Sequence, residues 1–355
     1  MGRKKPAPGT RDHALWVEGC EPVCAGLISA AALVGIGNAI VDVIAHCDEA
    51  FIARMNLNKG AMTLIDTARA NTLYDAMGPA VEISGGSGAN PTVGVASLGG
   101  RAAFIGKVGN DQLGGIFRHD IRAVGVQFDI APANSGTPTA RSMILVTPDA
   151  ERTMNTYLGA CQELTPADVD PHLIQRAKVT YMEGYLWDPP LAKEAFLKAA
   201  RIAHEAGQEV SLTLSDSFCV QRYLSEFQDL VRNHVDILFA NTSEILALWE
   251  TDDWDEAVRQ TRQHCDLAAL TRSEKGSVIV TADEVHEIPA WPVDKVVDLT
   301  GAGDLYAAGF LYGYTHGRDF AACGRIASLA AGEAISHVGA RPETPLAELV
   351  LQRLR

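Results

Sequence analysis

The residues best suited to chemistry in this chain of 355 residues lie near its end, in Gly301-Ala302-Gly303-Asp304. Two glycines let the backbone turn tightly and approach a ligand without a Cβ in the way. The apolar residues that follow, Leu305–Thr315, have helical spacing, so we expect the turn to open a helix. The free amides of Gly301, Ala302 and Gly303 would then point outward at the positive end of the helix dipole. The segment therefore predicts an anion-binding site.

Asp304 belongs to the first turn of this predicted helix, close to the expected anion. A carboxylate there can accept the proton of an attacking hydroxyl while the amides stabilise charge on a transferring phosphoryl group. The structural alternative is that Asp304 only caps its helix, which is common for Asp and is the stronger reading of the isolated motif. The rest of the sequence favours the catalytic reading.

A second glycine-rich region spans residues 85–115, where Gly85-Gly86-Ser87-Gly88-Ala89-Asn90 precedes Leu98-Gly99-Gly100 and the segment Ile105–Asp111. This region and Asp298–Asp304, with the Ala-Ala-Gly-Phe that follows, closely resemble the two signatures of the ribokinase-like (PfkB-type) kinases. The resemblance runs from about residue 31 to the end and is strongest to adenosine kinase-like members. It implies a three-layer α/β/α sandwich with a mostly parallel central sheet and a small β lid, and an ATP-dependent phosphotransferase.

The resemblance also implies an acceptor pocket lined by residues from both signatures and from Gly35–Asp42. These residues are Asn38, Asp42, Gly86, Ser87, Asn90 and Asp304. One Asp and two Asn supply the paired donors and acceptors that a polyol needs, and Gly86 is expected to admit the sugar ring closely. On the residues alone, Asn90 is more typical of a cap for the helix after Pro91.

For the phosphate donor, the resemblance implies MgATP. The residues expected to bind it are Asn241, Glu244, Thr271, Gly276, Gly301, Gly303 and Arg152. Asn241-Thr-Ser-Glu244 by itself indicates a capping box, and in the resembled family it influences magnesium, usually through water. The glycine at 276 is expected to permit approach of the ribose and phosphates. Asp298 and Thr300 match positions that hold a monovalent cation such as K⁺.

Arg152 follows Pro148-Asp149-Ala150-Glu151, a turn signal between the β-rich runs Thr137–Thr147 and Arg152–Leu158. These runs predict a hairpin. Arg152 at its tip is a candidate clamp on the phosphates, although a solvated arginine is the more common case. With segments 45–65 and 80–84, residues 134–158 are expected to form the lid.

The C-terminal two-thirds of the chain alternates β-branched runs with helical patterns, which favours a mostly parallel sheet covered on both faces. Expected strands are Val179–Glu183, Glu209–Leu214, Val235–Ala240, Leu267–Leu270 and Ser277–Thr281, and expected helices are Pro190–Glu205, Phe218–Asn233, Thr242–Trp249 and Trp254–Cys265. Ala31–Val43 is expected to begin with a buried first strand. We expect one kinase domain over residues 29–355, preceded by an unstructured extension over residues 1–28.

The formal net charge of −14 disfavours nucleic acid and anionic membranes as partners, so we expect a small-molecule substrate and a monomer or homodimer. Seven scattered cysteines favour a reduced, cytoplasmic compartment over a disulfide or zinc framework. The apolar run Val23–Ile36 resembles a weak secretory signal, but acidic residues interrupt the approach to it. No stretch approaches the length of a membrane helix.

Other nucleotide-binding patterns fit poorly. Gly35-Ile-Gly37 has Ile40 where a dinucleotide fingerprint needs its third glycine, and Gly106-Lys107 lacks the Ser or Thr of a Walker A motif. This disfavours a nicotinamide-dependent dehydrogenase. A binding protein without catalysis is disfavoured by the intact Asp304.

For the acceptor, Ser87 and Ser215-Asp-Ser-Phe218 resemble adenosine kinase more than ribokinase, so we expect adenosine, with a free sugar such as ribose or fructose as the alternative. Candidates for the apolar slot that a base needs are Phe51, Met143, Tyr157 and Leu158, for each of which core packing is the alternative.

Overall fold

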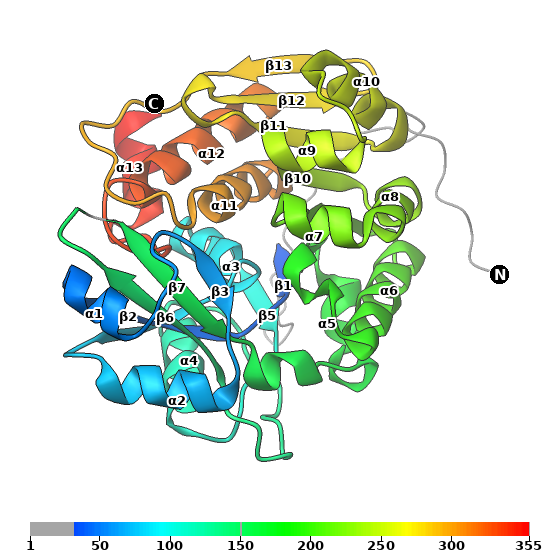
Figure 1. Cartoon of the computed structure of the whole chain (residues 1–355). Helices are drawn as coiled ribbons and strands as arrows, with labels where there is room; N and C mark the ends of the chain where they lie inside the picture. The colour runs from blue at the N-terminus through cyan, green and yellow to red at the C-terminus, as the bar shows by residue number, and fades with distance from the viewer. Residues whose placement is uncertain (1–31, 150, 355) are drawn as a thin grey trace.

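The computed structural model describes residues 32–149 and 151–354 of the chain. The predicted extension over residues 1–28, and residue 150 in the predicted hairpin turn, lie outside the described residues. Figure 1 shows a large α/β body and a smaller sheet beside it. We call these the body and the lid sheet.

The body is built on one eight-stranded sheet with the order β13-β12-β11-β10-β9-β8-β1-β5. The strands are β1 (Leu33–Ile36), β5 (Ala102–Ile105), β8 (Val179–Glu183), β9 (Glu209–Thr213), β10 (Ile237–Asn241), β11 (Leu267–Thr271), β12 (Ser277–Thr281) and β13 (Val285–Ile288). Six of them, from β11 to β5, are parallel, and β12 and β13 continue antiparallel. The expected mostly parallel central sheet is confirmed.

Helices cover both faces of this sheet because its strands bury side chains on both sides. In β8, Tyr181 packs into one hydrophobic core and its neighbour Met182 packs into another on the opposite face. The first core is formed with α3 (Ala89–Ser97), α4 (Gln112–Ala123), α11 (Ala302–Thr315), α12 (Phe320–Ala334) and α13 (Leu346–Arg353). The second is formed with α5 (Pro171–Arg176), α6 (Pro190–Glu205), α7 (Ser217–Arg222), α8 (Leu224–Asn233), α9 (Thr242–Leu248) and α10 (Trp254–His264).

The lid sheet has five strands in the order β3-β7-β6-β2-β4. They are β2 (Ile40–His46), β3 (Met62–Leu64), β4 (Val81–Gly85), β6 (Ala140–Val146) and β7 (Arg152–Tyr157), and they carry α1 (Glu49–Arg54) and α2 (Thr67–Ala76). The predicted hairpin is present as the antiparallel pair β6–β7. The expected segment 45–65 is largely helix and loop, and only the end of β2 at Ala45–His46 and the short β3 in it pair with the sheet.

The expected first strand from Ala31 to Val43 is two strands in two different sheets. The chain leaves β1 of the body, turns at Gly37-Asn38-Ala39 and enters the lid as β2. Alternation along β2 then places Val41 and Val43 on the buried face and Asp42 on the more open one. An apolar run can predict a buried strand, but a turn of three residues within it leaves little trace in the pattern.

The chain crosses a second time between lid and body at Gly86, between β4 and α3. Gly86 has φ +103°, and a Cβ there would lie 2.2 Å from the carbonyl oxygen of Asn38. The two crossings therefore pass directly over one another, and this contact requires glycine at position 86.

Two further differences concern the edge of the body. The predicted helix Phe218–Asn233 is divided into α7 and α8 at Tyr223. Strand β13 was not predicted, because its alternating exposed residues Val285 and Glu287 give a weak hydrophobic signal at the sheet edge. Within the described part of the chain, no helix is both long and apolar enough to cross a membrane.

Replacing Gly86 by Ala should destabilise the protein by about 2–3 kcal/mol, because the new Cβ meets both an unfavourable φ and the Asn38 carbonyl. Gly99→Ala is the matched control, since Gly99 has φ +88° with open space where the Cβ would be. Thermal and urea unfolding of both variants measure the difference. Equal losses of stability would mean that the crossing is not closely packed.

Candidate active site

The glycine loop and Asp304 have the geometry of an anion site with an adjacent acid. Helix α11 begins at Ala302, after Gly301 with φ +78°. The amide of Ala302 donates to Leu299 O at 3.3 Å, so it is not free as expected. The amides of Gly301 and Gly303 have no hydrogen-bond partner among the described residues. The N-terminus of α11 therefore presents two open amides next to Asp304.

Asp304 is bonded to a residue from the other glycine-rich region. Its Oδ2 accepts a hydrogen bond from Asn90 Nδ2 at 2.8 Å, and the structure gives it no capping bond within its own helix in the described chain. Asn90 is not a cap either, because α3 begins at Ala89 and its N-cap is Gly88. The Oδ1 atom of Asn90 is buried without a partner in the described part of the protein. A buried, unpaired acceptor beside an aspartate is suited to a ligand hydroxyl.

Two carboxylates of the site titrate near neutral pH. Burial raises the pKa of Asp304 to about 6, although the hydrogen bond from Asn90 and the charge of Arg341 lower it. Burial raises the pKa of Asp42 to about 7, against the charges of Arg341 and Arg152. Asp304 is thus mainly ionised at pH 7 and has a pKa suited to accepting a proton.

Asn38 is held by Glu183, a residue that the sequence analysis did not single out. Asn38 Nδ2 donates to Glu183 Oε1 at 2.6 Å, and the backbone amides of Asn38 and Gly88 donate to Oε2 at 3.0 and 2.6 Å. A Cβ at Gly37 would lie 2.3 Å from the same Oε2 atom. Glu183 is only 1% exposed, and its burial raises its pKa to about 7. The signal available in the sequence was an acidic residue at the end of a buried parallel strand.

The remaining acceptor candidates lie at the second crossing. Ser87 is half-buried between Gly86 and Gly88. Close approach of the Asn38 carbonyl accounts for glycine at position 86, and the expected contact of Gly86 with a sugar ring stays a prediction. The structure therefore brings together Asn38, Gly86, Ser87 and Asn90, and Asp42 follows the first crossing on β2.

Arg152 lies between the lid and the glycine loop. Its guanidinium contacts Asp298 Oδ2 at 2.8 Å and donates to Thr300 Oγ1 at 3.0 Å, and its side chain is 13% exposed. The expectation of a solvated hairpin arginine is wrong. Asp298 also accepts from the amides of Thr300 and Gly339. The positive charge next to Asp298 and Thr300 is thus supplied by Arg152.

The donor-side residues follow two neighbouring strands. Asn241 and Glu244 form the predicted capping box, with Glu244 N donating to Asn241 Oδ1 and Asn241 N donating to Glu244 Oε2, both at 3.0 Å. Thr271 ends β11 beside Asn241 in register. Gly276 has φ +82°, and a Cβ there would lie 2.0 Å from Ile288 O, so packing against β13 by itself requires glycine at this position.

Amide and carboxylate oxygens at the carboxyl edge of a parallel sheet fit a magnesium ion that keeps its waters. Burial raises the pKa of Glu244 to about 7, and a cation nearby would favour its ionised form. Among the described residues, no group of three or more His, Cys, Asp or Glu is placed to hold a metal directly.

Three of the four candidates for the base slot pack in or against the core of the lid, the alternative considered for each of them. Met143 is in register with Val43 on the buried face of the lid sheet, and Phe51 packs beside it in the core of the lid. Tyr157 packs against the same core. Two other aromatic residues are open to solvent at the ends of β8 and β9: Tyr185 is 36% exposed and Phe218 is 71% exposed.

Tyr185 lies in the field of the acidic residues of the site. The charges of Asp216, Glu244 and Asp304 add to burial in raising its pKa. The Tyr185 amide donates to Ser215 Oγ at 3.3 Å, which connects it to the segment that carries Phe218.

A three-layer α/β body with an aspartate beside open amides at a helix N-terminus defines a kinase for small-molecule hydroxyls. The chain belongs to the pfkB family of carbohydrate kinases, whose family model matches residues 64–347. The resemblance found in the sequence is thereby confirmed, and the protein is a kinase.

Two solved structures similar to this chain are named as different kinases, one as an adenosine kinase and one as a probable sugar kinase. An adenosine kinase from Sinorhizobium meliloti is 57% identical, with a TM-score of 0.85 over 91% of this chain and 99% of that one. A probable sugar kinase from Rhizobium etli is 54% identical, with a TM-score of 0.86 over 92% and 99%. A nucleoside kinase from Methanocaldococcus jannaschii is 28% identical over 76% of this chain and 85% of its own length.

Replacing Glu183 by Gln should destabilise the protein by about 1–3 kcal/mol, because an amide cannot accept all three hydrogen bonds from Asn38 and Gly88. We also expect a higher KM for the acceptor and an unchanged KM for ATP, since Asn38 lies on the acceptor side. Thermal unfolding and steady-state kinetics measure both effects. A stable variant with both KM values unchanged would show that Glu183 does not hold Asn38 in place.

Proposed function

We propose that this kinase transfers the γ-phosphoryl group of ATP to the hydroxymethyl hydroxyl of a nucleoside, with adenosine as the acceptor. The observation that carries the proposal is Asp304, which lies beside the open amides of Gly301 and Gly303 and is hydrogen-bonded to Asn90. The first turn of helix α11 thus combines a base with an anion hole, and α3 contributes an acceptor-side amide through Asn90.

In the proposed reaction, the acceptor hydroxyl gives its proton to the Asp304 carboxylate as its oxygen forms a bond to the γ-phosphorus. The bond between that phosphorus and the β,γ-bridging oxygen breaks, and ADP leaves. The amides of Gly301 and Gly303 stabilise the charge on the transferring group. Arg152 reaches the same loop and is placed to pair with phosphate oxygens.

On the donor side, Asn241, Glu244, Thr271 and Gly276 are proposed to border ATP. Magnesium, when bound, neutralises charge on the phosphates. The Asn241–Glu244 pair would hold it through water. Potassium has a weaker case, because Arg152 already supplies positive charge to Asp298 and Thr300. Activity measured with sodium or potassium as the only monovalent cation tests this point.

On the acceptor side, Asp42, Asn38, Ser87 and Asn90 are proposed to bind the ribose hydroxyls. Exposed aromatic rings are expected for a base and not for a free sugar, and Tyr185 and Phe218 supply them at the carboxyl edge of the sheet. The name of the Sinorhizobium meliloti relative agrees with a nucleoside. The free-sugar alternative is supported by the name of the Rhizobium etli relative.

Asp304→Asn should lower kcat by about 10²–10⁴-fold, because the hydroxyl loses its proton acceptor, while the affinity for ATP stays within about twofold of the parent. The matched control is Asp319→Asn, since Asp319 caps the next helix through Ala322 N and Asn also caps well. Coupled ADP-release assays and nucleotide titrations measure the two quantities. Near-parental turnover in Asp304→Asn would exclude Asp304 as the base.

Among adenosine, other nucleosides, ribose and fructose, adenosine should give the highest kcat/KM. Phe218→Ala and Tyr185→Ala should raise KM for the nucleoside about 5- to 100-fold, because a base–aromatic contact contributes about 1–3 kcal/mol, and should leave KM for ribose unchanged. Tyr185→Phe, which keeps the ring, is the control. If a free sugar were the best acceptor, the protein would still be a kinase, but the assignment of a nucleoside as its acceptor would be refuted.

A further inference from the structure

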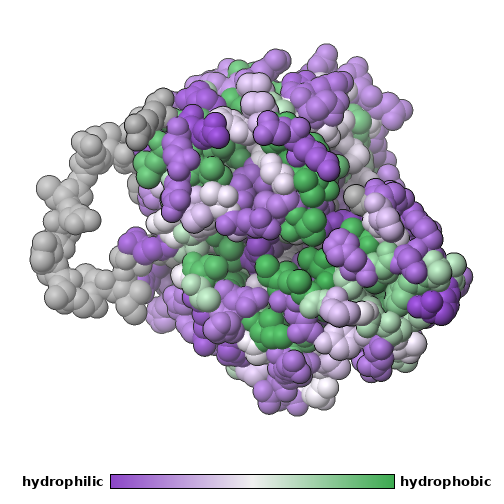
Figure 2. Space-filling model, turned by 90° about the vertical axis from the view of Figure 1, so that its left-hand side faces the viewer, coloured by the Kyte–Doolittle hydropathy of each residue, from purple (hydrophilic) through white to green (hydrophobic). Residues whose placement is uncertain are grey.

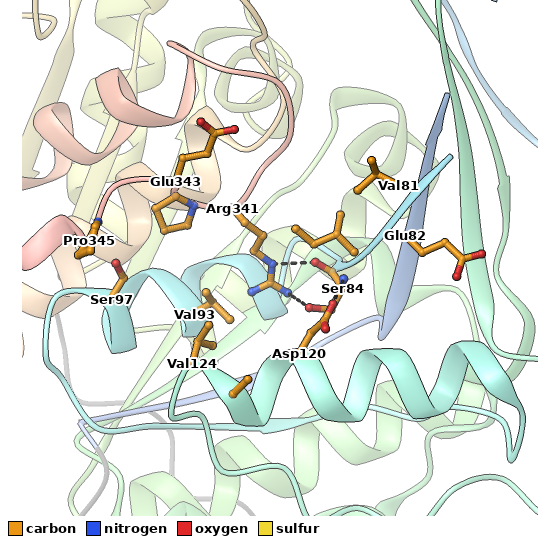
Figure 3. Close-up of a pocket in the computed structure, with 13 residues that line it drawn as sticks. Val81, Glu82, Ser84, Val93, Ser97, Asp120, Val124, Arg341, Glu343 and Pro345 are labelled. Carbon is orange, nitrogen blue, oxygen red and sulfur yellow. Dashed lines mark hydrogen bonds between the residues drawn. The ribbon is translucent and has the colours of Figure 1, made fainter. Parts of the chain in front are cut away.

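Arg341 makes contacts that the proposed reaction does not use. It lies in the loop between α12 and α13, and its guanidinium points at the end of lid strand β4 (Figure 3). Nε donates to Ser84 O at 2.8 Å, the second terminal nitrogen donates to Ser84 Oγ at 3.3 Å, and the first donates to Ala89 O at 3.2 Å. One side chain therefore joins the C-terminal loop, the lid sheet and helix α3.

These anchor points lie on the two sides of the second crossing. Ser84 precedes Gly85-Gly86 in the lid, and Ala89 follows Gly86 as the first residue of α3. Ser84 is in register with Val41, the neighbour of Asp42, and the Asp42 carboxylate packs over Gly85, where a Cβ would lie 2.3 Å from its Oδ2. On the other side, Ala89 is the neighbour of Asn90, which holds Asp304.

The charge of Arg341 acts on the same two carboxylates. It lowers the pKa of both Asp42 and Asp304, against the burial that raises them to about 7 and about 6. Burial lowers the pKa of Arg341 itself to about 10, so the guanidinium stays charged at neutral pH. Asp120 acts on it from α4 and accepts from Ser84 N at 3.0 Å. The other charged groups whose fields reach Asp42 or Asp304 are Arg152, Asp298, Glu183 and Glu244.

We propose that Arg341 is a positioning residue that clamps the crossing between lid and body and holds a positive charge close to Asp42 and Asp304. It touches neither reacting atom and acts through these two acids. The inference rests on the proposed function, because it gives Asp304 the role of base and Asp42 a role in acceptor binding.

Arg341 lines a pocket of about 650 Å³, and this pocket allows a chemical-rescue test. Figure 3 shows Val81 and Ser84 of β4, Val93 of α3 and Asp120 of α4 around the guanidinium. The surface in Figure 2, on the side of α1 and α13, is hollowed near its middle, where hydrophobic residues gather. A guanidinium ion added to the solution can therefore enter the space left by a shortened side chain.

The experiment compares the pH dependence of kcat/KM for the acceptor in the parent and in three variants. Loss of positive charge raises the pKa of Asp42 and Asp304. Because a base works only when it is ionised, the acid limb of the pH profile should move to higher pH. Arg341→Gln removes the charge and should move the limb up by about one pH unit, with about a fivefold loss at pH 6. Arg341→Lys keeps the charge and should retain the parental limb with a lower melting temperature. Arg341→Ala should regain activity with millimolar guanidinium chloride but not with sodium chloride.

The control is Arg325→Gln, because Arg325 is exposed on α12, and its profile should match the parent. A folded Arg341→Gln variant with the parental acid limb would overturn the proposal, as would Arg341→Ala that guanidinium does not rescue. If Arg341→Gln does not fold, Arg341→Lys provides the test. An acid limb of its pH profile displaced by one pH unit would overturn the proposal. A parent inactive on every acceptor would refute the proposed function instead.

Discussion

The site depends on one hydrogen bond, from Asn90 Nδ2 to Asp304, because it joins two helices that start from different glycine-rich turns. Helix α3 follows the crossing out of the lid, and helix α11 follows the glycine loop. The two helices also pack directly, since Gly94 of α3 lies against Leu305 and Ala308 of α11, and the hydrogen bond fixes the carboxylate within that packing. Burial raises the pKa of Asp304 to about 6 against the hydrogen bond from Asn90 and the charge of Arg341, in the range where a carboxylate is ionised but still accepts a proton.

Arginines balance the acidic groups that this arrangement concentrates. The chain carries a net charge of −14, and four buried or half-buried carboxylates around the site have a raised pKa. Arg152 pairs with Asp298 from the lid, and Arg341 acts from the C-terminal loop. Both arginines contact the lid sheet or belong to it. The position of the lid and the charge of the site are therefore coupled by direct contacts.

The sequence predicted the parts of the structure that depend on local pattern. Strands such as Val179–Glu183, helix Pro190–Glu205 and the helix after Gly301 follow from apolar periodicity and turn chemistry. It could not predict contacts between segments far apart in the chain. Glu183 lies 145 residues from Asn38, and Arg341 lies 257 from Ser84, so neither contact leaves a local signal.

Two glycines show the same limit of prediction from sequence. Gly86 and Gly276 were predicted to let ligands approach, and the structure shows that the carbonyls of Asn38 and Ile288 by themselves require glycine at both positions. A glycine indicates close approach, but the sequence does not say of what. The roles of the site residues toward acceptor and nucleotide stay predictions until the variants are measured.

The two crossings at Asn38 and Gly86 also bear on how such proteins diversify. The chain enters the lid at Asn38 and leaves it at Gly86, through residues proposed to face the acceptor, whereas Asn241 and Thr271 end strands β10 and β11 of the body. Substitutions in the lid can therefore reshape acceptor recognition and leave the nucleotide side intact. A scaffold divided in this way allows the acceptor to change while the transfer chemistry of the body is kept.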